Sequence, residues 1–216
     1  MKFMIAVPCM DTMPVLAAQS LINMHKPKDT DVVFHPNSLV YDARNLLSLQ
    51  AIQERYDYVL WVDSDILCPV DGLMTLIDDM ETYDTRMVSG LYVMRSFPPD
   101  PVIYDVVDQP RIDKDGHMVK QIRTYTNYPE DSVFDVDGCG FGFVLTRVDL
   151  LKDVWDKFGP AFAPLPWASE DISFCHRVNI LGDQIMCDSR VKLGHIGTMV
   201  YTDKLIRRGG GVDEKH

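Results

Sequence analysis

Short, continuous apolar runs recur along the first half of the chain. Phe3 to Val7 (FMIAV) and Val59 to Val62 (VLWV) contain no polar residue, and Asp31 to His35 (DVVFH) has an apolar centre. The two continuous runs are typical of buried strands in the middle of a parallel sheet, and Asp31 to His35 is a second, short strand candidate. We therefore predict strands in these three stretches and in a fourth, residues 87–93.

Helical periodicity fills the intervals between the predicted strands. Residues 14–24 have a helical pattern, residues 43–55 place apolar side chains on one helical face, and a third helix is predicted after Pro69. Its apolar residues recur at i, i+3, i+4 and i+7, namely Leu73, Leu76, Ile77 and Met80. The alternation of strands and helices over residues 1–93 predicts an α/β fold with a mostly parallel, doubly wound sheet.

The second half of the chain is less regular. Residues 96–132 contain many Pro and Asp residues, and Asp115-Gly116 is typical of a hairpin turn. Strands are predicted over residues 141–145 and 191–193. This change of pattern indicates a small β-hairpin segment beside the main sheet.

Two further helices are predicted from their N-terminal signals. Thr146 and Asp149 have the spacing of a capping box, and the helix that follows is expected to end near Phe158, before a Gly-Pro pair. A Pro-rich loop then leads to Ser169, which we expect to be the N-cap of a helix over residues 170–181.

Composition narrows the class of protein. A chain of 216 residues suits one substantial core, so we expect residues 1–200 to form a single domain and residues 201–216 a flexible tail or lid. The net charge of −11 disfavours extended contact with nucleic acid or anionic lipid. The five cysteines form no C-x-x-C pair, and no window has the ~20 apolar residues that span a bilayer. We therefore expect a cytoplasmic protein without a membrane span.

An acidic triplet, Asp63-Ser64-Asp65, ends the apolar strand at Val62. Carboxylates are costly in a dry interior unless they are paired or bind a metal ion. Ligands of open α/β sheets bind at the carboxyl ends of strands, and two closely spaced carboxylates suit a hard divalent cation that also binds phosphate oxygens. The alternative is a turn whose acids cap the next helix.

Two other phosphate chemistries fit the sequence less well. A phosphatase with an aspartyl nucleophile would carry its D-x-D after the first strand, where this chain has Pro8-Cys9-Met10-Asp11. A nucleotidyltransferase would have a Gly-rich phosphate-binding loop at the same place.

Four motifs occur in order along the chain: ARN at residues 43–45, WVDSD at 61–65, SED at 169–171 and GHIG at 194–197. Together they resemble the motifs of GT-A-type glycosyltransferases, most closely the family-2-like enzymes that include many small bacterial and bacteriophage members. The resemblance implies a GT-A-type, Rossmann-like catalytic domain with an acceptor-side hairpin segment. It also implies a nucleoside-diphosphate-sugar donor.

The resemblance implies roles for individual residues. Asp63, Asp65 and His195 would hold Mn²⁺ or Mg²⁺, which neutralises the charge that develops on the departing diphosphate. Asp171 would be the general base for the acceptor hydroxyl, and Glu170 would hydrogen-bond the sugar or the acceptor; a helix dipole alone also favours acids at this position. The residues expected around the nucleotide sugar are Pro8, Asp11, Arg44, Asp63, Ser64, Gly138 and Trp167.

Several alternatives stay open at this stage. A sugar-phosphate nucleotidyltransferase and a non-catalytic nucleotide- or sugar-binding module would use much of the same site. The acceptor can be a saccharide, a protein, a small molecule or a modified DNA base. The basic tail residues Lys204, Arg207 and Arg208 are candidates for a lid over the diphosphate.

Overall fold

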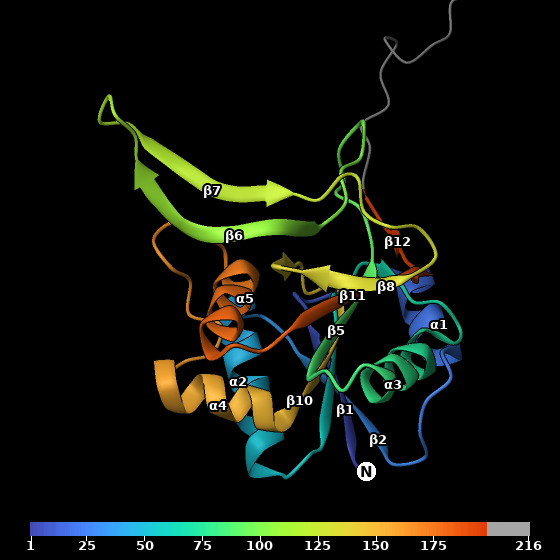
Figure 1. The fold of residues 1–216 in the computed structure, drawn as a ribbon. Coiled ribbons are helices and arrows are strands. Elements are labelled where there is room, and N and C mark those ends of the chain that lie inside the picture. The colour runs from blue at the N-terminus through green and yellow to red at the C-terminus, as the bar shows by residue number, and fades with distance from the viewer. Residues whose placement is uncertain (198–216) are drawn as a thin grey trace, which may run out of the picture.

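The computed structural model describes residues 1–197, apart from the side chain of Lys120, and is built around a seven-stranded sheet (Figure 1). Its strands, in spatial order, are β2 (Thr30–His35), β1 (Phe3–Pro8), β3 (Tyr58–Val62), β10 (Phe143–Arg147), β5 (Met87–Leu91), β11 (Ile185–Lys192) and β8 (Val133–Val136). The expected tail or lid, with Lys204, Arg207 and Arg208, lies outside the described residues.

Most strands of the sheet run in one direction, as predicted, but the sheet is mixed. β1 is parallel to both β2 and β3, and β5 is parallel to β11. β10 is antiparallel to its neighbours β3 and β5, and β8 is antiparallel to β11. The strands that the sequence analysis assigned to residues 1–93 therefore all run in one direction, with β10 inserted between two of them.

Helices cover both faces of the sheet (Figure 1). They are α1 (Val15–Asn23), α2 (Val40–Gln53), α3 (Gly72–Thr82), α4 (Val148–Phe158) and α5 (Glu170–Leu181). On β3, Val59 and Trp61 join the core on the side of α2, α4 and α5, whereas Leu60 and Val62 join the core on the side of α1 and α3. The uninterrupted apolar run of this strand follows from burial on both faces.

The predicted capping box at Thr146 is wrong. Thr146 is fully buried in β10, where its Oγ1 accepts a hydrogen bond from Trp61 Nε1 at 3.0 Å and donates one to the Val59 carbonyl at 3.3 Å. The N-cap of α4 is Arg147, which pairs with Asp149. A buried indole N–H needs an acceptor, and this need outweighs the cap. Ser169 does lie at the N-cap of α5, but its Oγ donates to Asp171 and caps no backbone N–H.

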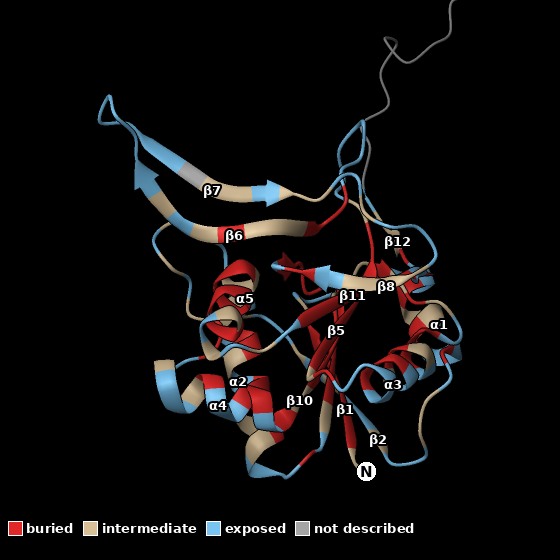
Figure 2. Cartoon of the chain, viewed as in Figure 1, coloured by how far each residue is buried: buried red, intermediate tan, exposed pale blue. Residues whose placement is uncertain are grey.

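The predicted hairpin is present and forms a second, smaller sheet. Its strands are β7 (Met118–Thr124), β6 (Ile103–Ile112) and β9 (Gly138–Cys139), and Gly116 in the turn has the positive φ of +82° that glycine tolerates. The hairpin extends from the body of the protein, and its outer part is exposed (Figure 2). A third sheet pairs β4 (Ile66–Leu67) with β12 (Gly194–His195). Over residues 1–197, no helix is long and apolar enough to cross a membrane.

Candidate functional site

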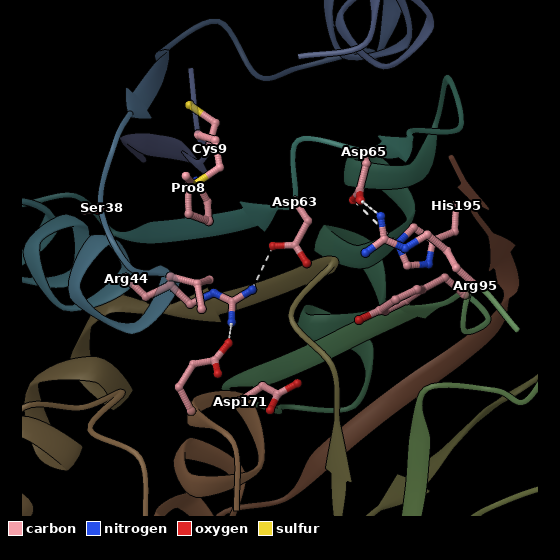
Figure 3. Close-up of a pocket in the computed structure, with 13 residues that line it drawn as sticks. Pro8, Cys9, Ser38, Arg44, Asp63, Asp65, Arg95, Asp171 and His195 are labelled. Atoms are coloured by element: carbon pink, nitrogen blue, oxygen red, sulfur yellow. Dashed lines mark hydrogen bonds and ion pairs between the residues drawn. The ribbon is translucent and has the colours of Figure 1, made fainter. Parts of the chain in front are cut away.

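A pocket of about 440 Å³ lies at the carboxyl ends of β1, β3 and β5 (Figure 3). This edge is where open α/β sheets bind ligands. Seven of the residues predicted from the sequence line the pocket: Pro8, Arg44, Asp63, Asp65, Glu170, Asp171 and His195. Segments that are far apart in the sequence therefore meet at one place.

Arg44 of α2 connects two of the predicted acids. It is only 2% exposed, its Nη2 lies 2.7 Å from Asp63 Oδ1, and its Nη1 donates to Glu170 Oε1. The guanidinium also lies over the rings of Phe141 and Phe162, 5.4 and 5.9 Å from their centroids. The two ion pairs of Arg44 therefore join α2, the end of β3 and the start of α5, which are three of the elements that line the pocket.

Burial and mutual charge shift the pKa values of Arg44, Asp63 and Glu170. Burial alone would lower the pKa of Arg44, but Asp63 and Glu170 raise it above its ordinary value. Burial raises the pKa of Asp63, with a contribution from Asp65 and opposition from Arg44. Burial also raises the pKa of Glu170, again against the effect of Arg44. The permanent positive charge of Arg44 thus favours the ionised form of both carboxylates, against the effect of burial.

Asp65 and His195 face each other on the other side of the pocket. β12 pairs with β4, so that His195 lies opposite Ile66, and the Ile196 N–H donates to the Asp65 carbonyl at 2.8 Å. His195 Nδ1 lies 2.8 Å from the Val93 carbonyl, which can only accept, so Nδ1 carries the proton. In the neutral form of the ring Nε2 is then an acceptor, and it lies 3.5 Å from Asp65 Oδ1.

Two acceptors at this separation need a cation or a shared proton between them. A carboxylate and an imidazole nitrogen are ligands that Mn²⁺ accepts, and the hydrogen bond from Nδ1 to a backbone carbonyl is the usual way to fix the tautomer of a metal-binding histidine. Asp65 and His195 therefore fit a divalent metal ion. Asp63 is turned toward Arg44, and it does not complete a compact three-ligand group with them in the described part of the chain.

A different acid–histidine group lies at the hairpin tip. Asp113, Asp115 and His117 are exposed, and their ligand atoms lie within 4.8 Å of one another. Asp113 Oδ1 accepts hydrogen bonds from the backbone N–H groups of Asp115 and His117, as expected of an aspartate that stabilises a turn. The turn geometry accounts for this group without a metal ion.

Asp171 lies at the first turn of α5 and points into the pocket (Figure 3). Its Oδ1 accepts hydrogen bonds from Ser169 Oγ and the Ile172 N–H. Glu170 is bound to Arg44, whereas Asp171 has no ion pair with any residue in the range 1–197. Of the two acids, Asp171 is the one whose carboxylate is available to a ligand.

The other four predicted residues do not line the pocket. Asp11 is exposed, and Ser64 is half-buried between the two acids of the triplet. A Cβ on Gly138 would lie 2.9 Å from Val107 Cγ2, so this glycine allows β9 to pack closely. The ring of Trp167 packs edge-on against His176, with centroids 5.0 Å apart.

Six residues of the pocket were not predicted from the sequence: Cys9, Met10, Ser38, Val40, Tyr92 and Arg95. Tyr92 directly follows β5 and Arg95 lies in the loop after it, so the rule that located Asp63 at the end of β3 applies to them as well. Tyr92 was instead included in the predicted strand over residues 87–93, and its hydroxyl accepts a hydrogen bond from the Gly142 N–H at 3.3 Å. Arg95 forms an ion pair with Asp65.

The fold and the pocket together define the structural class: an α/β protein with the GT-A fold, matched to GT-A glycosyltransferases over most of its length. Protein A197 from STIV superposes with a TM-score of 0.59 at 16% identity, over 94% of this chain and 97% of that one. GalNAc-T7, in a crystal structure with UDP, GalNAc and Mn²⁺, superposes with a TM-score of 0.56 at 11% identity, over 91% of this chain and 44% of that one. No protein-family model and no curated protein sequence matches the chain.

Proposed function

We propose that this protein is a metal-dependent glycosyltransferase that moves a sugar from a nucleoside-diphosphate sugar to an acceptor hydroxyl. The observation that carries the proposal is the pairing of Asp65 Oδ1 with His195 Nε2, 3.5 Å apart, in the strand-end pocket of a GT-A fold. Both the position and the ligand types suit a cation that binds a diphosphate.

The metal ion is assigned to Asp65 and His195, with Asp63 beside them. When bound, Mn²⁺ or Mg²⁺ supplies Lewis-acid stabilisation of the leaving diphosphate. The imidazole ligand favours Mn²⁺ over Mg²⁺. UDP sugars are the first donors to test, because GalNAc-T7, which has the same fold, was crystallised with UDP and Mn²⁺.

The proposed base is Asp171. The acceptor oxygen forms a bond to the anomeric carbon, the bond from that carbon to the diphosphate oxygen breaks, and the hydroxyl proton passes to the Asp171 carboxylate. Asp171 is free of ion pairs within the described residues, whereas Glu170 is held by Arg44 and positions the start of α5. A carboxylate that is not held in an ion pair can face the acceptor hydroxyl, as a general base must.

The proposal is tested by following nucleoside diphosphate release from a panel of nucleotide sugars in Mn²⁺, with water or simple glycosides as acceptors. Asp171→Asn should bind the donor as the wild type does and should lose roughly 10²–10⁴-fold in turnover. A wild-type protein that binds no nucleotide sugar in the presence of metal would overturn the proposal. Binding with no release from any donor would favour the non-catalytic module.

A further inference from the structure

Arg95 lies where the proposed metal site opens to solvent. Its Nη1 donates to Asp65 Oδ2 at 2.7 Å, while His195 Nε2 faces the other oxygen of the same carboxylate (Figure 3). Asp65 is therefore shared between a guanidinium and an imidazole. The sequence motifs gave Arg95 no role.

The charge of Arg95 conflicts with a metal ion at Asp65. A guanidinium stays protonated at every pH at which proteins are studied, so it brings a permanent positive charge to the carboxylate. A divalent cation on Asp65 would meet this charge within a few ångströms, and the two cations repel each other. Arg95 and the metal ion thus compete for one ligand.

The Arg95 side chain is free to move away from Asp65. Its side chain is 55% exposed, and exposed ion pairs are weak. The backbone around it is held independently: the Met94 N–H donates to the Asp100 carbonyl at 2.8 Å, and Val93 is bridged to Pro101. The stem of Arg95 passes over Gly197, which has no side chain to restrict it. The side chain can therefore reorient while the loop keeps its conformation.

A released Arg95 has a suitable partner in the donor. The planar fork of a guanidinium binds phosphate oxygens through two parallel hydrogen bonds. Arg95 lines the same pocket as Asp63 and Asp65, where the proposed diphosphate would lie. Metal and diphosphate binding would each favour the movement of Arg95 away from Asp65.

We propose that Arg95 is an exchangeable counter-ion of the donor site. It neutralises Asp65 when the metal ion is absent, and it binds the diphosphate once the metal ion occupies Asp65. This inference rests on the proposed function. It makes metal and nucleoside diphosphate bind cooperatively, with Arg95 responsible for part of the coupling.

The test measures free Mn²⁺ by electron paramagnetic resonance as it is titrated into the full chain, with and without UDP. Without UDP, Arg95→Met should bind Mn²⁺ about three- to fivefold more tightly than the wild type, because the competing charge is gone. In saturating Mn²⁺, the same variant should bind UDP at least about tenfold more weakly, because charge-assisted hydrogen bonds to the phosphates are lost. Arg95→Lys, which keeps the charge but not the fork, should restore the wild-type Mn²⁺ affinity and only part of the UDP affinity.

Arg123→Met is the matched control, since Arg123 forms a similar exposed ion pair with Asp105 on the hairpin, at 2.8 Å. It should leave both affinities unchanged. Suppose that Asp65→Asn removes Mn²⁺ binding but that Arg95→Met binds Mn²⁺ no more tightly than the wild type. This result would overturn the exchange of Arg95 and leave the proposed function standing. A wild type without Asp65-dependent Mn²⁺ binding would overturn both.

Discussion

At the scale of single residues, the site depends on how a few charges are compensated. Arg44 is the clearest case, because it is buried between Asp63 and Glu170 and stacks on two phenylalanine rings. The sequence motif identified Arg44 as a site residue and predicted contact with the nucleotide. It could not reveal that both Nη atoms are occupied by protein carboxylates, because Glu170 is 126 positions away in the sequence.

Replacing Arg44 by methionine should therefore destabilise the fold strongly. The variant keeps most of the apolar stem but leaves two half-buried carboxylates without their buried counter-ion. Breaking a fully buried pair costs about 3–5 kcal/mol, and we expect a loss near the lower end of that range. The free energy of unfolding in urea measures this. Adding Glu170→Gln to Arg44→Met should recover part of the lost stability. If Arg44→Met alone stays within about 0.5 kcal/mol of the wild type, Arg44 is not a stabilising counter-ion of the two carboxylates.

Gly140 provides a second residue-scale prediction. A Cβ at this position would lie 2.1 Å from Tyr92 Oη and 2.6 Å from Val102 Cγ1, so Gly140→Ala must displace the Tyr92 ring that lines the pocket. We expect a loss of about 1–3 kcal/mol in stability, as for other overpacked sites. In a Tyr92→Phe background, which removes the clashing hydroxyl, the same substitution should cost less. Equal costs in both backgrounds would contradict this account.

At the scale of secondary-structure elements, the strands and helices with a clear local hydrophobic pattern could be predicted from the sequence. The apolar runs located β1, β2, β3 and β5, and the i, i+3, i+4 pattern located α3. β11 was predicted only at residues 191–193, because its buried Asp188 and Ser189 interrupt the apolar pattern. The pairing of β12 with β4, which places His195 beside Asp65, could not be predicted from the local sequence pattern either.

The β6–β7 hairpin is separable from the donor site. Asp108 pairs with Gln121 across the two strands, and residues 111–119 are all exposed. Replacing residues 109–120 with Asn-Gly should close the strands with a two-residue turn. The thermal midpoint should change by less than about 2 °C, and UDP binding in Mn²⁺ should be unchanged. A loss of UDP binding would show that the hairpin belongs to the donor site.

At the scale of the whole molecule, the strand order of the central sheet depends on β10, a strand from the second half of the chain that is inserted between two strands of the first half. β10 lies between β3 and β5, antiparallel to both, and joins the first half of the chain to the second. The parallel part of the sheet could be predicted from the sequence because strand–helix alternation is a local property. The insertion could not be predicted, because pairing between segments so far apart depends on the complete set of competing strands.

The stability of the whole fold should depend on pH through a buried carboxyl pair outside the pocket. Burial, a hydrogen bond with Asp188 and the charge of Asp188 raise the pKa of Asp79 to about 7. Burial alone would raise the pKa of Asp188, but hydrogen bonds with Arg190 and Asp79 bring it below its ordinary value. Arg190 bridges the two, with its Nη2 2.6 Å from Asp79 Oδ1 and 2.9 Å from Asp188 Oδ2.

The raised pKa of Asp79 decides whether the stability of the fold rises or falls with pH. Its folded-state pKa lies above the value of about 4 in an unfolded chain, so its contribution to stability is complete below pH 4 and is lost as the pH rises through about 7. Asp188 has a lowered pKa, and its contribution is lost only at more acidic pH. Asp79→Asn, which cannot ionise, should remove the decline in stability between pH 5 and 8. For the wild type we expect this decline to lower the Tm by about 5–10 °C. Parallel Tm profiles for wild type and variant would contradict this assignment.

The central claim is that Asp65 belongs to a metal site that binds a nucleoside diphosphate. Calorimetric titration of UDP into the full chain tests it most directly, with Mn²⁺ and with EDTA, for the wild type, Asp65→Asn and Asp115→Asn. Asp115 is the matched control, because it belongs to the other acidic group, at the hairpin tip. The account predicts Mn²⁺-dependent binding to the wild type and to Asp115→Asn, and none to Asp65→Asn. Binding that survives in Asp65→Asn but is lost in Asp115→Asn, or that does not need the metal ion, would contradict it.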